Sequence, residues 1–137
     1  MSLAPSLTQG SSLRRARTGL IALWALQFAL AGMFLLAGSS KLLGDPAMVG
    51  LFDAIGIGQW FRYLTGLIEV GSALALLVPS FAVFGALALV ATMVGAVIVH
   101  LIILGASPAL PAILLLGSAG VVWARRHQLV GVQPAVR

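Results

Sequence analysis

Glu69 and His100 are the side chains of this sequence best suited to chemistry, because both are ionisable and both lie within apolar stretches. Glu69 is the only acid inside such a stretch, and His100 lies near the end of another. Carboxyl and imidazole groups can exchange protons and hydrogen-bond a polar ligand. An acid near the bilayer centre costs about 2.5 to 3.5 kcal/mol on insertion scales, so such groups usually face protein or water. We therefore expect any specific function to involve the surroundings of Glu69.

The composition indicates an integral membrane protein. Of 137 residues, 61% are hydrophobic and 8% are charged, which lies outside the range of soluble domains. The net charge is +5, but the arginines cluster beside apolar stretches, where they encode membrane topology, so no nucleic-acid binding is expected. The chain has no cysteine, which excludes thiolate metal sites and disulfide exchange. We predict no metal site and assign no catalytic residue.

Four apolar segments are long enough to cross a bilayer, which takes about 20 residues. They run from Gly19 to Ser40, from Phe61 to Val78, from Phe81 to Leu104 and from Ala109 to Ala124. The first is longer than the apolar region of a signal peptide, about 7 to 15 residues, and is interpreted as a retained span. The short connections between the later spans require antiparallel neighbours. The sequence therefore predicts an all-α fold, a transmembrane up-down four-helix bundle.

The distribution of charge sets the predicted orientation. Lys and Arg are more numerous in the N-terminal tail and after the fourth span than in the other charged loop, which holds Lys41 and Arg62. The positive-inside rule then predicts that both termini are cytoplasmic, with the protein in the cell inner membrane. Aromatic residues should mark both interfaces. They are Trp24 and Trp123 on the inner side, and Trp60 and Tyr63 on the outer side.

The chain divides into three predicted parts. Residues 1–18 are expected to form a disordered cytoplasmic N-terminal tail, residues 19–127 the four-span membrane domain, and residues 128–137 a cytoplasmic C-terminal tail. The first outer loop should contain a short amphipathic helix. Asp45 and Pro46 are typical of a helix start, and Gly56 of a helix end. Apolar residues between them recur at helical spacing: Met48, Leu51, Phe52 and Ile55.

Small and polar residues accompany both ionisable side chains, which indicates that these helix faces point into the bundle. The face of Glu69 also carries Arg62, Thr65, Gly66, Ser72 and Ala73. The face of His100 carries Ala88, Thr92 and Ala96. Elsewhere, Gln27 is expected to hydrogen-bond a neighbouring helix, and several glycines are expected to allow close packing. These are Gly32, Gly38, Gly95, Gly117 and Gly120.

Two interpretations of the polar residues stay open. In the first, Glu69 is protonated or paired with His100, Arg62 or Lys41, and the cluster only holds helices together. In the second, Glu69, His100, Lys41 and Arg62 line an outward-facing pocket that binds a polar head group or exchanges protons. A small transporter is disfavoured, because the sequence shows no inverted repeat.

Three stretches of the sequence resemble the DoxX-like family of small four-helix membrane proteins. They are G-S-S-K-L at Gly38 to Leu42, T-G-L-I-E-V-G-S-A-L-A-L-L-V-P at Thr65 to Pro79, and the third span with His100 near its end. The order of four spans, with a Lys after the first and a Glu in the second, is more specific than any single stretch. The resemblance covers residues 19–127 and carries over Lys41, Glu69 and His100 as family positions.

This resemblance implies a link to quinone-linked oxidoreductases, including the thiosulfate-quinone type, or to redox-defence assemblies, while other relatives act as assembly chaperones. Glu69 and His100 would suit the carbonyl oxygens of a quinone, and a bundle cavity would suit its ring. Two functions therefore stay open, as does enzymatic activity itself. One is an accessory subunit of a quinone-linked oxidoreductase assembly. The other is a non-catalytic assembly or interaction protein whose Glu69 and His100 cluster is structural.

Overall fold

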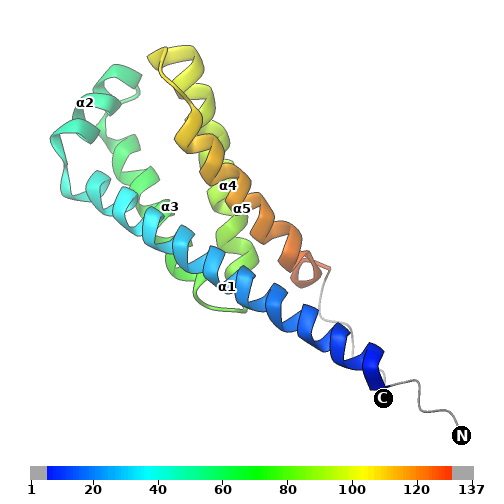
Figure 1. The fold of residues 1–137 in the computed structure, drawn as a ribbon. Helices are drawn as coiled ribbons and strands as arrows, with labels where there is room; N and C mark the ends of the chain where they lie inside the picture. Colours follow the sequence, from blue (N-terminus) through cyan, green and yellow to red (C-terminus); the bar gives the residue numbers. More distant parts are fainter. Residues whose placement is uncertain (1–5, 131–137) are drawn as a thin grey trace, which may run out of the picture.

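The computed structural model describes residues 6–130, and helices are the only regular elements in that part of the chain (Figure 1). They are α1 (Ser6–Leu43), α2 (Pro46–Ile55), α3 (Gln59–Leu76), α4 (Ala82–Val99), the π-helical segment η1 (His100–Leu104), α5 (Ala109–Arg125) and the 3-10 turn η2 (Arg126–Gln128). The all-α prediction is confirmed for these residues.

The long helices pack in a chain of neighbours, with α1 against α3, α3 against α4, and α4 against α5 (Figure 1). Helix α5 also contacts α1, which closes the arrangement. A tight turn separates α3 from α4, where the Val78 N–H donates to the Ala75 carbonyl at 3.1 Å. Gly105, in the left-handed conformation at φ 56°, turns the chain between η1 and α5. Short connections thus bring consecutive helices side by side.

Three helical stretches are long and apolar enough to cross a membrane: Gln9–Leu43, Ala82–Leu104 and Ala109–Gln128. Helix α3 forms where the second span was predicted but is not among them, because Gln59, Arg62 and Glu69 lower its hydropathy. The outward faces of the apolar stretches carry large hydrophobic side chains, with Leu36 and Leu116 each 73% exposed. Such surfaces suit lipid rather than water.

Helix α1 is longer than the sequence predicted. The expected disordered tail covered residues 1–18, but α1 already begins at Ser6, and residues 1–5 lie outside the described part. Leu and Arg, which favour helix, dominate the stretch from Leu13 to Arg17, so the helix can continue beyond the apolar segment. The first residue of the expected C-terminal tail is held against the helices, since the Gln128 side-chain amide donates to the Pro79 carbonyl at 2.8 Å. Residues 131–137 lie outside the described part.

The predicted short amphipathic helix is confirmed as α2. The Asp45 carboxylate accepts a hydrogen bond from the Ala47 N–H at 2.9 Å, and Gly56 ends the helix at φ 79°. The predicted apolar face is buried or half-buried, and Phe52 contacts Phe61 of α3 edge-on, with ring centroids 5.9 Å apart. Because α2 packs against α3 and η1, it covers one end of the helix assembly.

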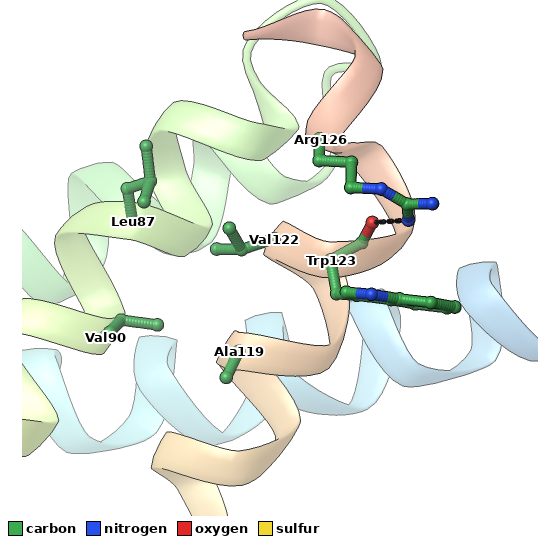
Figure 2. Close-up of a pocket in the computed structure, with 6 residues that line it drawn as sticks. All are labelled: Leu87, Val90, Ala119, Val122, Trp123 and Arg126. Carbon is green, nitrogen blue, oxygen red and sulfur yellow. Dashed lines mark hydrogen bonds between the residues drawn. The ribbon is translucent and has the colours of Figure 1, made fainter.

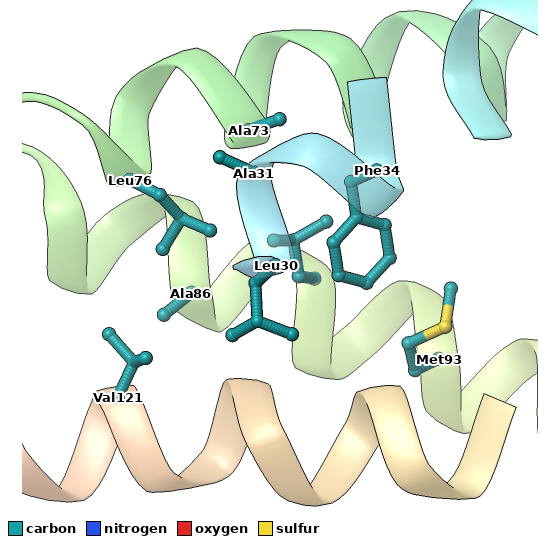
Figure 3. Packing of buried hydrophobic residues seen from close by; sticks show 9 residues of the cluster. Leu30, Ala31, Phe34, Ala73, Leu76, Ala86, Met93 and Val121 are labelled. Atoms are coloured by element: carbon teal, nitrogen blue, oxygen red, sulfur yellow. The ribbon is translucent and has the colours of Figure 1, made fainter. Parts of the chain in front are cut away.

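The apolar core lies where α1, α3, α4 and α5 meet (Figure 3). Fully buried large side chains come from each of them: Phe34 from α1, Leu76 from α3, Leu89 from α4 and Val121 from α5. Small residues between them, such as Ala73 and Ala86, let the helices approach closely. The core therefore fixes how the polar faces of α1 and α3 meet.

Candidate functional site

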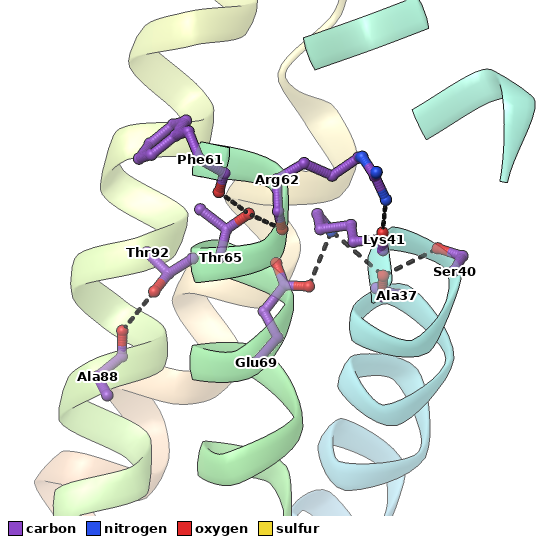
Figure 4. A network of polar contacts seen from close by, with 9 residues as sticks. All are labelled: Ala37, Ser40, Lys41, Phe61, Arg62, Thr65, Glu69, Ala88 and Thr92. Carbon is purple, nitrogen blue, oxygen red and sulfur yellow. Dashed lines mark hydrogen bonds and ion pairs between the residues drawn. The ribbon is translucent and has the colours of Figure 1, made fainter. Parts of the chain in front are cut away.

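A buried ion pair joins α1 to α3 (Figure 4). The Lys41 ammonium lies 2.8 Å from Oε2 of Glu69, and the side chains are 14% and 3% exposed respectively. The same ammonium also lies 3.4 Å from the Ala37 carbonyl. Lys41 lies in the last turn of α1, where a cation interacts favourably with the helix dipole. The carboxylate therefore meets a full positive charge supplied by the neighbouring helix.

Two glycines allow α1 and α3 to approach at this point. A Cβ added to Gly38 would lie 2.7 Å from a methyl group of Val70 and 3.0 Å from the Gly66 carbonyl oxygen. A Cβ added to Gly66 would in turn lie 3.1 Å from the Gly38 carbonyl oxygen. The 2.7 Å contact at Gly38 is closer than a side chain tolerates, and the contact at Gly66 is tight, so glycine suits both positions. The close approach places Lys41 within reach of Glu69.

Arg62 reinforces the same junction. The residue is 4% exposed, and its Nη1 donates to the backbone carbonyl of Lys41 at the end of α1. Its Nε donates to the Gln59 side-chain oxygen at 2.5 Å, and its guanidinium stacks over the Tyr63 ring at 4.2 Å. Arg62 thus satisfies a carbonyl that α1 leaves without an intrahelical partner. The structure brings Lys41, Arg62 and Glu69 together.

His100 is not joined to this cluster. Its Nδ1 lies 2.8 Å from the carbonyl of Ala96, one turn earlier in its own helix, and the side chain is half-buried. Among the described residues, no hydrogen bond or ion pair links it to Glu69. His100 opens η1, which packs against α2, and α2 meets α3 near Phe61, roughly 12 Å along the helix from Glu69. Lys41 of α1, and not His100, is therefore the partner of the Glu69 carboxylate.

A second polar cluster joins α1, α3 and α5 at the other end of the molecule. Gln27 is fully buried, and its amide donates to the Leu76 carbonyl at 2.5 Å. Its side-chain oxygen accepts from Nε of Arg125 at 2.8 Å, and the Arg125 guanidinium lies 5.4 Å from the centre of the Trp24 ring. The predicted interhelical hydrogen bond of Gln27 is confirmed. Arg125 was expected only to set topology, yet it is 7% exposed and links two helices.

The chemistry available to the first cluster follows from its own pairing. Each charged group there has a partner, and in the described part of the chain no three His, Cys, Asp or Glu residues come together to hold a metal ion. The face of α3 predicted to point inward does so, since Gly66, Ser72 and Ala73 are buried with Glu69. This arrangement suits a structural role, in which the Lys41 and Glu69 ion pair holds α1 against α3.

Apolar helices of membrane-spanning length, held together by buried polar clusters, define a small helical membrane protein. The chain belongs to the DoxX-like family, whose model matches residues 25–128. No curated protein and no solved structure matches the chain. The matched region includes the Lys41 and Glu69 pair and the whole of α2 through α5.

Proposed function

We propose that this DoxX-like protein crosses the cell inner membrane four times, through α1, α3, α4 and α5, as an up-down bundle with both termini in the cytoplasm. The basic residues support this orientation, because Arg14, Arg15, Arg17, Arg125 and Arg126 all belong to one end of the assembly. Helix α3 carries a paired acid, and a paired charge crosses a bilayer far more readily than a lone one. Helix α2 then covers the outer end.

Single cysteines test this topology, since the chain has none of its own. Ser80→Cys lies in the turn between α3 and α4, and Ser107→Cys in the turn between η1 and α5, and both residues are exposed. In intact cells a membrane-impermeant maleimide should label Ser107→Cys and leave Ser80→Cys unlabelled until the cells are permeabilised. Labelling of both variants, or the opposite pattern, would contradict the proposed orientation.

We further propose that the protein is a non-catalytic accessory or interaction component of a membrane assembly, and that its Lys41 and Glu69 pair is structural. The supporting observation is that the charged groups of this cluster find their partners within the protein. Glu69 pairs with Lys41, and Arg62 donates a hydrogen bond to the Lys41 carbonyl. A ligand head group would have to displace the ammonium from the carboxylate. Displacing it would leave a buried charge unpaired, at a cost of about 3 to 5 kcal/mol.

The quinone-linked form of this function remains the second candidate, supported by His100. Its Nδ1 is held by the Ala96 carbonyl, so the ring donates there and leaves Nε2 as an acceptor. The residue opens a π-helical segment, and such segments recur at functional sites. A quinol hydroxyl is a group that such an acceptor would bind. The redox centre would belong to a partner enzyme.

One experiment separates the two forms. Protein purified in a mild detergent is analysed by mass spectrometry for retained quinone, alongside thermal unfolding of the wild type and of Glu69→Gln and His100→Gln variants. The structural form expects Glu69→Gln to lower the melting temperature and quinone to stay far below one molecule per chain in every sample. Near-stoichiometric quinone that disappears in His100→Gln at unchanged stability would support the quinone-linked form and overturn the non-catalytic one.

A further inference from the structure

Helix α2 is held to the rest of the protein by little apolar burial. It packs against α3 and η1, and Phe52 is the only one of its residues that is buried. The longer helices meet over far more apolar surface, as where α4 and α5 join beside Leu87, Val90 and Val122 (Figure 2). Among the α-helices, α2 is therefore the one that packing fixes least.

Glycines with positive φ lie at both ends of α2. Gly44, at φ 75°, joins α1 to α2, while Gly56, at φ 79°, and Gly58, at φ 107°, join α2 to α3. These are three of the four glycines with positive φ among the described residues. Glycine changes its backbone conformation at little steric cost, and hinges are formed by a few residues at the ends of elements. The two connections therefore allow α2 to turn as a unit while α1 and α3 stay packed.

A single side chain, that of Gln59, links α2 to α3 by hydrogen bonds. Its Nε2 donates to the Asp53 carboxylate at 2.7 Å and to the Val49 carbonyl at 3.0 Å, both in α2. Within residues 6–130 no other hydrogen bond joins α2 to another helix. The amide oxygen of Gln59 accepts from Nε of Arg62, which leaves the NH₂ group directed at α2. Gln59 thus holds α2 in place.

Arg62 connects Gln59 to the junction between α1 and α3. Its Nη1 donates to the carbonyl of Lys41, the residue whose ammonium pairs with Glu69 (Figure 4). A Cβ added to Gly44 would lie 3.9 Å from the same Nη1, so the guanidinium lies beside the connection between α1 and α2. Arg62 is buried there. A turn of α2 about Gly44 would uncover this cation.

We propose that α2 is a hinged cover and that Gln59 is its latch. In the closed position, which the structure shows, the Gln59 amide ties α2 to α3 and Arg62 is shielded. When the two bonds from Gln59 to α2 break, α2 turns at its flanking glycines and Phe52 leaves the Phe61 ring. The Arg62 guanidinium then becomes accessible at this end of the assembly. The cover is independent of whether the protein binds a quinone.

Distances between two spin labels test the cover, because the chain has no cysteine of its own. The labels are attached to Ala54→Cys on α2 and to Ala109→Cys at the start of α5, both exposed positions. Double electron–electron resonance on the full chain in a mild detergent should give one main distance. Gln59→Leu should add a second, longer distance and raise the ratio of open to closed protein about tenfold. A tenfold change equals about 1.4 kcal/mol, the order of one hydrogen bond to a charged group.

Two substitutions separate the latch from a general loosening of the protein. Asp53→Ala removes one of the two bonds from Gln59 and leaves the bond to Arg62 in place, so it should raise the ratio less, about threefold. Gln128→Leu removes a side-chain amide bond to the turn between α3 and α4 and should leave the ratio at the wild-type value. An unchanged distance in Gln59→Leu would overturn the latch, and so would an equal shift in Gln128→Leu.

A reference pair of labels reports whether the other helices stay packed. Ser80→Cys and Ala109→Cys lie at opposite ends of α4 and should keep one distance in every variant. If Gln59→Leu alters this reference distance, the exposed Asp53→Ala substitution decides, and no increase of the open form in it would overturn the latch. A featureless spread of distances from α2, in place of a second defined distance, would show that α2 unfolds and would overturn the hinge.

Discussion

Removing one partner of the Lys41 and Glu69 pair should destabilise the protein, and removing both together should cost little more than removing one. The variants are Lys41→Met, Glu69→Gln and the double substitution, which keep the side-chain sizes close to those of the wild type. The two ionised groups lie 2.8 Å apart and largely out of solvent. Each single change leaves the other charge in the contact between α1 and α3.

The magnitude follows from charge and burial. Two unit charges at 2.8 Å attract by about 6 kcal/mol at an effective dielectric constant near 20. Ordering the lysine side chain offsets roughly 1.5 to 2 kcal/mol of this, and lost hydration offsets more. We expect Lys41→Met to cost about 3 kcal/mol, since Glu69 is 3% exposed and cannot reach water. Glu69→Gln should cost about 2 kcal/mol, since Lys41 is 14% exposed and can turn outward.

The assay is reversible unfolding in mixed micelles of dodecylmaltoside and sodium dodecyl sulfate, followed by tryptophan fluorescence and circular dichroism. The double-mutant cycle should yield a coupling free energy of about 2 kcal/mol. A coupling free energy below about 0.5 kcal/mol would refute a stabilising Lys41 and Glu69 pair, because the effects of substitutions at independent sites add within that range. A larger cost for Glu69→Gln than for Lys41→Met would refute the reasoning from exposure.

Two further changes probe the helix contacts. Gly38→Ala should destabilise by about 1 to 3 kcal/mol, because its methyl group would overlap Val70, whereas Gly32→Ala on the same helix, with open space around it, should be neutral or slightly stabilising. Equal effects of the two substitutions in the unfolding assay would contradict the close approach of α1 and α3. Gln27→Leu should cost about 2 to 3 kcal/mol, because it leaves the buried Arg125 guanidinium without its acceptor. A melting temperature matching that of Gly32→Ala would count against that hydrogen bond.

The local features of the fold were predictable from sequence. The cap at Asp45, the apolar spacing after it and the glycine at position 56 defined α2 to within a residue of its observed bounds. The small and polar face of α3 also pointed inward as predicted, because residues three and four apart share one side of a helix. Each of these predictions depends only on residues that are close to one another in the sequence, within a few helical turns.

The partner of Glu69 could not be chosen in the same way. Lys41, Arg62 and His100 were all candidates, and the sequence holds no distance between helices. The start of η1 and the engagement of His100 with Ala96 emerged only from the folded chain, as did the pairing with Lys41 across α1 and α3. The π-helical turn had no sequence signal, because the residues that follow His100 in it are of the same apolar types that form α4.

By itself, the sequence determined a membrane protein of helices with one acid on an inward face, since hydrophobic composition and helical periodicity are local properties. Only the tertiary structure decided which small residues lie in close contacts between helices. Gly38 lies against α3 while Gly32 faces open space, although both looked like close-packing positions. The same holds for Arg125, a topology signal in sequence and a buried link to Gln27 in the fold. Such differences depend on which helix lies opposite, and that is settled by packing of the whole chain.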